Sequence, residues 1–127
     1  MLSKQNRVRT SSTFSHTVRS GARSGRRNLV LYARCTTDTE PSRFGFIVSR
    51  NVGNAVTRNL VKRRLREAAA SALVSQPRGI DFVVRALPHS ASVGWSELCG
   101  DFERALKTTV GQVVRSHVKA GKESSIV

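Results

Sequence analysis

Acidic residues are scarce in this sequence, and none precedes Asp38. Eight Asp and Glu residues stand against 22 Lys and Arg residues, which gives a net charge of +14 on 127 residues. Seventeen of these 22 cations are arginines, whose planar guanidinium pairs with phosphate and stacks on bases. A chain with so little negative charge repels itself unless a polyanion neutralises it. The composition therefore predicts a nucleic-acid partner.

Long apolar runs are missing as well. No segment is long and apolar enough to cross a membrane, and the basic segment lacks a Trp- or Phe-rich stripe, so we expect no membrane partner. The first residues contain no apolar segment of a signal peptide, which favours the cytoplasm. An acid-free N-terminus rich in Arg and Ser also fits an organelle transit peptide, but strands predicted from residue 28 leave little room for one.

Motifs for catalysis and metal binding are also absent. His16, His89 and His117 lie in three different predicted elements, and none has a partner at the spacing of a metal site or general base. Cys35 and Cys99 are isolated, which predicts reduced core cysteines instead of a disulfide or a zinc site. We therefore expect no catalytic residue and no metal site in the protein. If RNA is processed, another molecule would hold the catalytic metal ions.

The length and a hydrophobic content of 39% predict one domain, residues 1–118, with a mobile tail at 119–127. Periodicity predicts helices over residues 12–20, from 54 or 55 to 74, and from about 92 to 117. Alternation predicts strands over 28–35, 43–50 and 80–86, with room for a fourth within 22–27. We expect Ser11 or Ser12 to cap the first helix and Gly21 to end it.

Each predicted strand has one core-facing side. These sides comprise Leu29, Leu31, Ala33 and Cys35, then Phe44, Phe46 and Val48, then Ile80, Phe82 and Val84. On the opposite side, Tyr32 lies beside Arg34, a pair that can stack on single-stranded nucleic acid; a plain sheet-edge tyrosine is the alternative. Gly45 suits either a close ligand or a packed helix. In the last strand, we expect the side chains on the outward face to be Asp81, Val83 and Arg85.

The two longer helices have distinct apolar stripes. The stripe of the basic helix should lie on the sheet, and it comprises Val61, Leu65, Ala68, Ala69 and Ala72. Successive helix residues are rotated by about 100°, so a group of polar side chains projects away from this apolar stripe. The group comprises Asn59, Lys62, Arg63 and Arg66, and Arg64 points in a different direction from them. Glu67 is the sole acid between residues 41 and 80, so this face favours nucleic-acid contact over a solvated surface. In the last helix we expect Trp95 to seal a core edge and the buried side chains to be Leu98, Phe102, Ala105, Leu106 and Val113.

Residues 53–67 read Gly-Asn-Ala-Val-Thr-Arg-Asn-Leu-Val-Lys-Arg-Arg-Leu-Arg-Glu. This segment resembles the signature of the bacterial ribonuclease P protein component, which surrounds an Arg-Asn-Arg triplet and a following Lys-Arg pair. Supporting matches occur in the expected order at Phe14 with Gly21, Leu29–Tyr32, Arg43 with Gly45, Val48–Ser49 and Asp81. The resemblance extends over residues 7–110.

The resemblance implies an α+β fold. This is an α-β sandwich of about three helices and a roughly four-stranded mixed sheet, with an unusual left-handed β-α-β crossover carrying the basic helix. It also implies that the chain is the RNA-binding subunit of ribonuclease P, an endoribonuclease. The subunit would bind the catalytic RNA and the 5′ leader of precursor tRNA and assist removal of the leader. The RNA and the substrate would bind Mg²⁺, in agreement with the missing catalytic motifs.

The same resemblance implies two sets of site residues. The set for the RNA subunit is Arg58, Asn59, Lys62, Arg63 and Arg66. The set for the leader is Phe14, Val18, Tyr32, Arg50 and Asn51. Cations would neutralise phosphates and aromatic rings would stack on leader bases. The sequence departs from the family pattern at three places: the family usually has a basic residue at Leu60, an aromatic residue at Val18 and a Lys pair at Arg50–Asn51. The loss of one cation and one ring should weaken the affinity for the leader or for the RNA subunit.

Two other classes of protein would explain part of the sequence. A stand-alone RNA-binding protein, such as a ribosomal protein or an RNA chaperone, would share the charge but would show no preference for precursor over mature tRNA. A DNA-binding helix-turn-helix protein would place a helix shortly before the recognition helix, whereas here a predicted strand precedes the basic helix. We therefore expect no DNA partner.

Overall fold

The computed structural model describes residues 2–37 and 39–126, with side chains up to residue 115. The described chain forms three α-helices, namely α1 (Ser11–Ser20), α2 (Ala55–Ser75) and α3 (Trp95–Ile126). It forms four strands, namely β1 (Ala22–Gly25), β2 (Leu29–Cys35), β3 (Arg43–Ile47) and β4 (Ile80–Ala86). Three short 3-10 helices complete it, namely η1 (Lys4–Asn6), η2 (Arg50–Val52) and η3 (Pro88–Ser92). The predicted α+β class is confirmed.

The four strands form one mixed sheet in the order β1-β2-β4-β3. β2 is antiparallel to both β1 and β4, whereas β3 is parallel to β4. The connection between the parallel pair contains α2, so the expected β-α-β crossover is present. Its left hand stays a prediction.

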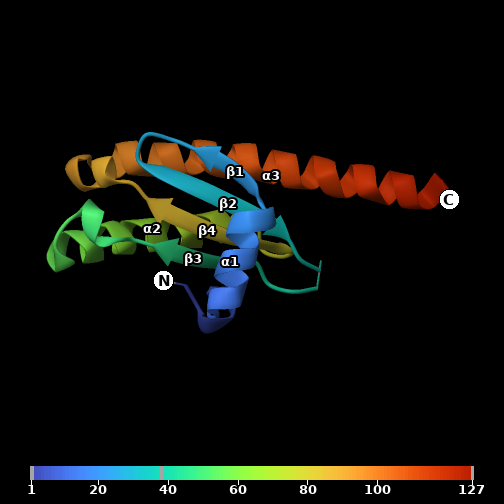
Figure 1. Cartoon of the computed structure of the whole chain (residues 1–127), viewed down its shortest axis with the longest axis horizontal. Helices are drawn as coiled ribbons and strands as arrows, with labels where there is room; N and C mark the ends of the chain where they lie inside the picture. The colour runs from blue at the N-terminus through green and yellow to red at the C-terminus, as the bar shows by residue number, and fades with distance from the viewer. Residues whose placement is uncertain (1, 38, 127) are drawn as a thin grey trace.

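Helices cover both faces of the sheet. Figure 1 shows α1 crossing in front of the strands, α2 behind them, and α3 running along the sheet and past its end. The main core lies between the sheet and the pair α2 and α3, and the Phe44 and Phe82 rings stack within it at 4.5 Å between centroids. This three-layer arrangement leaves the outer side of α2 to solvent.

Local sequence explains where α2 begins and which side it buries. The Asn54 side chain accepts a hydrogen bond from the main-chain N–H of Thr57 at 2.9 Å, a cap that contributes ~1 kcal/mol. All members of the predicted stripe are buried, namely Val61, Leu65, Ala68, Ala69 and Ala72. The helix therefore has one orientation in which its apolar side meets the sheet and its basic side does not.

The second face of the sheet is covered by α1, contrary to the prediction that β4 turns this side outward. Val83 and Asp81 have no exposed surface, and Tyr32 is only 6% exposed. Val83 and Tyr32 form a small second cluster, against which Phe14 and Val18 of α1 pack. A Cβ atom at Gly45 would lie 2.5 Å from the Phe14 ring, so Gly45 serves helix packing, the second of its two predicted roles.

Several element boundaries and burial states differ from the predictions. Thr10, not Ser11 or Ser12, caps α1, because its hydroxyl accepts from the Thr13 N–H. β3 ends at Ile47, since the chain turns into η2, and α3 continues to Ile126 instead of ending near residue 117. The mobile tail at 119–127 stays a prediction.

Three side chains expected to contribute to the core lie nearer the surface. Trp95, the first residue of α3, is 39% exposed and does not seal the core. Cys35 is exposed at the end of β2, and Cys99 is half-buried, so neither is a core cysteine. Burial raises the pKa of the Cys99 thiol, with Glu103 adding to the effect.

Candidate nucleic-acid interface

The solvent side of α2 carries a compact set of cations, which we call the basic surface. It borders a hollow of about 590 Å³ lined by Asn59, Lys62, Arg63, Arg66 and Glu67. Within the described side chains, no carboxylate lies within ion-pair distance of Lys62, Arg63 or Arg66. The structure thus brings four of the five predicted RNA-subunit residues together, and three of them, Lys62, Arg63 and Arg66, are cations without an ion-pair partner among the described residues.

The other two arginines of this helix are arranged differently. Arg58 lies one turn before Lys62, is half-buried and does not line the hollow; its Nε is buried without a hydrogen-bond partner among the described residues. Arg64 donates from Nη1 to the main-chain oxygen of Val93 at 3.0 Å. Arg64 therefore ties α2 to the segment before α3, in agreement with its predicted separation from the other cations.

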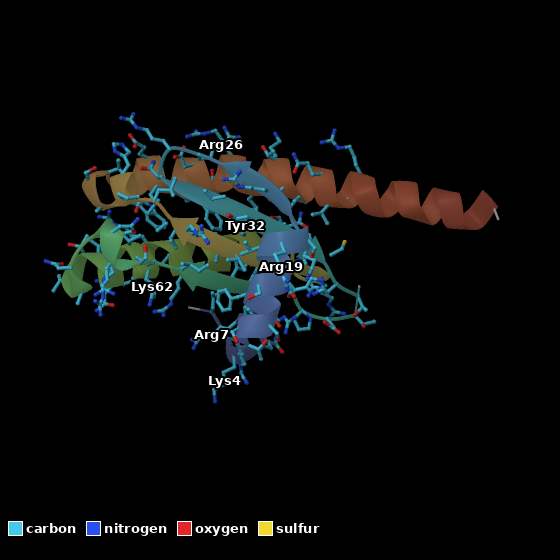
Figure 2. The ribbon with its side chains drawn as sticks, in the orientation of Figure 1. Lys4, Arg7, Arg19, Arg26, Tyr32 and Lys62 are labelled. Atoms are coloured by element: carbon cyan, nitrogen blue, oxygen red, sulfur yellow. The ribbon has the colours of Figure 1, made fainter. Side chains whose placement is uncertain are left out.

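A second hollow, the α1 groove, lies between α1 and the sheet. Its volume is about 500 Å³, and it is lined by Phe14, Ser15, Val18, Arg19, Ile47 and Arg85. Phe14 and Val18 belong to the predicted leader set, and both line this hollow, while their role in leader binding stays a prediction. Figure 2 shows Arg19 on α1, in front of the strands.

Sequence reasoning missed Arg19, Ile47 and Arg85 as groove residues. Arg85 is the single exposed residue of β4, whose other residues are all buried. No hydrogen bond or ion pair holds its guanidinium within the described part of the chain. Strand alternation did predict that Arg85 points outward. It could not predict that α1 would lie beside Arg85 and form a groove there.

The remaining leader residues do not line the α1 groove. Tyr32 lies beneath α1 in the second cluster, and its hydroxyl makes no hydrogen bond among the described residues. Arg50 and Asn51 are exposed on η2, where the Ser49 hydroxyl donates to Asn51 Oδ1. Arg34 is not free to clamp a ligand with Tyr32, because it pairs with Asp81.

Asp81 organises one end of the sheet under α1. Arg43 donates to its two carboxylate oxygens from Nε at 2.8 Å and Nη2 at 2.7 Å, and Arg34 donates at 3.0 Å. The hydrogen bond with Asp81 raises the pKa of Arg43 above its ordinary value, although burial acts in the opposite direction. This fully buried carboxylate therefore neutralises cations that would otherwise face the α1 side.

The described residues do not form a metal site or a membrane-spanning helix. Among the described residues, no group of three or more His, Cys, Asp and Glu side chains could hold a metal ion. In the same part of the chain, no helix has the length and apolar character needed to cross a membrane. The arrangement offers cations, an aromatic ring and a groove, which are the parts of an RNA-binding surface.

Comparison with known proteins agrees with these features. A model of the family described as ribonuclease P matches residues 2–110. A ribonuclease P protein component from Pseudarthrobacter chlorophenolicus is 54% identical over 125 residues, which cover 98% of this chain and 92% of the relative. Another, from Arthrobacter sp., is 58% identical over 110 residues, covering 87% of this chain and 81% of the relative.

Solved structures give the same result at the level of the fold. The RNase P protein from Staphylococcus aureus is similar with a TM-score of 0.74 and 27% identity, over 83% of this chain and 95% of that one. The RNase P protein from Thermotoga maritima gives 0.67 and 25%, over 77% of this chain and 92% of that one. The predicted α-β sandwich is thereby confirmed. Since the family match spans most of the sequence, this chain belongs to the bacterial ribonuclease P protein component family.

Proposed function

We propose that this protein binds the ribonuclease P catalytic RNA through the basic surface of α2 and the 5′ leader of precursor tRNA through the α1 groove. As a member of its family it is a component of ribonuclease P, an endoribonuclease, and its partner is the ribonuclease P RNA. The assignment of a surface to each RNA is our inference. We also place the protein in the cytoplasm, where tRNA precursors are processed.

The observation that carries this proposal is the unpaired charge of the basic surface. Lys62, Arg63 and Arg66 line one hollow, in which Glu67 is the single acid, and none of the three cations makes an ion pair with a described carboxylate. Cations arranged in this way bind the phosphates of a folded RNA and release its counterions. Asn59 adds a side chain that can donate and accept hydrogen bonds at the same hollow. Arg58 would contribute from the preceding turn.

The α1 groove suits a single strand better than a duplex. Its walls combine the Phe14 ring with the apolar side chains of Val18 and Ile47, and two cations, Arg19 and Arg85, stand at the same hollow. Rings and apolar side chains can stack with bases of any sequence, while guanidinium groups hold the phosphates. Tyr32 would support Phe14 from below, and Arg50 and Asn51 would contact the leader outside the groove.

We expect the chemical step to take place on RNA. The protein would position the leader and neutralise phosphates, and the catalytic RNA and the substrate would hold Mg²⁺.

Cleavage of precursor tRNA at low Mg²⁺ tests the proposal. The cognate RNA subunit is assayed with and without the protein, alongside a control that contains protein alone. We expect cleavage at the mature 5′ end only when protein and RNA are both present. If the protein adds nothing while the RNA alone cleaves at high Mg²⁺, the chain is better described as a stand-alone RNA-binding protein.

A further inference from the structure

A third hollow, which we call the edge cavity, lies between the two surfaces described above. It is smaller, about 190 Å³, and its lining includes Arg7, Phe14, Gly45, Phe46, Lys62 and Arg66. Phe14 also lines the α1 groove, and Lys62 and Arg66 also line the hollow of the basic surface. The three hollows therefore adjoin through shared side chains around the edge strand β3. In Figure 2, Arg7 and Lys62 lie on the same side of the molecule, below the strands.

The N-terminal segment forms one wall of the edge cavity. The main chain at Arg7 forms an isolated parallel β-bridge with Phe44 of β3, and the Val8 N–H donates to the Phe44 oxygen at 3.0 Å. Leu2 is only 3% exposed and belongs to the main core, which anchors the segment. Its main-chain oxygen accepts from Arg7 Nε at 3.1 Å and from Nη2 at 2.8 Å. The Arg7 guanidinium is thus held at the cavity although its side chain is exposed.

Arg7 keeps part of its hydrogen-bonding capacity for a ligand. A guanidinium has five N–H donors, and the two bonds to Leu2 use two of them, so three remain. Lys62 and Arg66 make no ion pair with any described carboxylate. Three cations therefore converge on one small cavity that contains no acidic lining residue.

The same cavity contains aromatic surface. Phe14 and Phe46 are each half-buried, so part of each ring remains accessible at the cavity, and the Phe14 ring packs directly over Gly45. Aromatic rings beside cations recognise a base together with its phosphate. The edge cavity is smaller than its two neighbours, and it lies between the α1 groove and the hollow of the basic surface, which are both proposed to bind RNA. An acidic peptide would use the cations but would gain little from the rings.

We propose that the edge cavity is an RNA subsite for one unpaired nucleotide, which joins the α1 groove and the basic surface into a single track around β3. This inference rests on the proposed function, because it assumes that both neighbouring surfaces bind RNA. The nucleotide can come from a leader long enough to pass β3 or from an unpaired segment of the catalytic RNA.

The test uses Arg7→Gln in the reconstituted holoenzyme. Dissociation constants are measured for mature tRNA and for precursors whose leaders are lengthened one nucleotide at a time, and also for the protein with the RNA subunit alone. Arg115→Gln is the matched control, because Arg115 is an exposed arginine that donates to a main-chain oxygen, that of Gly111, and lines none of the three hollows.

We expect Arg7→Gln to weaken binding about tenfold, as for the loss of one charge-assisted contact, while Arg115→Gln changes little. A loss confined to precursors beyond a certain leader length identifies the leader as the source of the nucleotide. A loss of affinity for the RNA subunit identifies the catalytic RNA. Wild-type affinity in both arms overturns the edge cavity inference.

Two further measurements separate the possible failures. If the wild-type holoenzyme itself gains no affinity from a leader, the proposed function has failed, whatever Arg7→Gln does. If Arg7→Gln lowers the melting temperature, Phe46→Leu replaces it, because leucine keeps apolar bulk and removes the ring. About fivefold weaker binding is then expected, and unchanged binding by a folded Phe46→Leu protein again overturns the inference.

Discussion

The two sides of the sheet handle positive charge in opposite ways. On the basic surface, Lys62, Arg63 and Arg66 have no acidic partner among the described residues. Under α1, by contrast, Arg34 and Arg43 both pair with the buried Asp81. Charge on one side is therefore available to RNA, whereas much of the charge on the other side is used within the fold. Under the proposed function, this difference predicts that charge contributes more to binding at the basic surface, and shape and stacking contribute more at the α1 groove.

Removal of the Asp81 charge should have the largest effect and should act on folding. Asp81→Asn would leave Arg34 and Arg43 without their shared carboxylate, and both are still largely covered, with 26% and 32% of their side chains exposed. We expect a loss of ~2 to 3 kcal/mol in the free energy of unfolding, measured in urea. Glu67→Gln, at an exposed acid that makes no ion pair with the described residues, should change the free energy of unfolding by less than ~0.5 kcal/mol. Equal urea midpoints for Asp81→Asn and the wild type would contradict the contrast between the two sides.

Loss of one cation from the basic surface should act on RNA binding instead. Arg63→Gln is expected to weaken binding to the RNA subunit about tenfold, because one charge-assisted phosphate contact is lost. A plot of log K against log salt has a negative slope, and the loss of one phosphate contact should make this slope shallower by about 0.7 to 0.9. Lys107→Gln, at an exposed lysine of α3 outside the three hollows, is the control. A slope that does not change would mean that Arg63 does not contact phosphate.

A smaller effect is expected for Arg85 of the α1 groove. Arg85→Gln should weaken precursor binding by about 1 kcal/mol, close to fivefold, while binding of mature tRNA stays the same. The difference between precursor and mature tRNA is the quantity to measure, because it isolates the leader. Arg27→Gln, an exposed arginine outside the groove, is the control. Equal losses for both RNAs would show that the groove does not distinguish a leader.

The smallest effect concerns Asp101, which lies outside both surfaces. Burial acts to raise its pKa, but hydrogen bonds from Arg104 and from Asn28 outweigh burial and hold the pKa below the ordinary value. Because the pKa is lower in the folded protein than in the unfolded chain, where it is about 3.9, the ionised Asp101 stabilises the fold at pH values above about 3.9. This stabilisation is lost as the pH falls through the pKa of the folded protein.

Asp101→Asn should therefore cost ~0.5 to 1 kcal/mol at neutral pH, and the gap to the wild type should narrow in acid. Melting temperatures measured from neutral to acidic pH test this prediction. RNA affinity should not change. A gap that widens in acid would show that the sign of the shift is wrong.

The contrast between the two sides also explains what could be predicted from the sequence. The buried stripe of α2 depends on local periodicity, and its position fixed the directions of Lys62, Arg63 and Arg66 as well. The cap at Asn54 was predictable for the same reason, since only neighbouring residues take part. Four of the five residues predicted to bind the RNA subunit could therefore be grouped before the fold was known, whereas Arg58 lies outside their hollow, and their role in binding stays a prediction.

The α1 side was harder because its contacts join distant parts of the chain. Strand alternation separates two faces but does not say whether a helix covers the second one, so Asp81 and Val83 were expected to face outward. The packing of Phe14 over Gly45 connects residues that are 31 positions apart. The same packing forms the groove in which Arg85 lies, and alternation alone cannot reveal it.

The main core connects Leu2 near the start of the described chain with Val113 far along α3. The parallel neighbours β3 and β4 are likewise separated by the whole of α2. Contacts between such distant segments form slowly, because chain entropy is lost before they can stabilise the fold. During synthesis, the core can close only after α3 has emerged from the ribosome. A chain that ends before Phe102 would lack one wall of its core and would not complete folding.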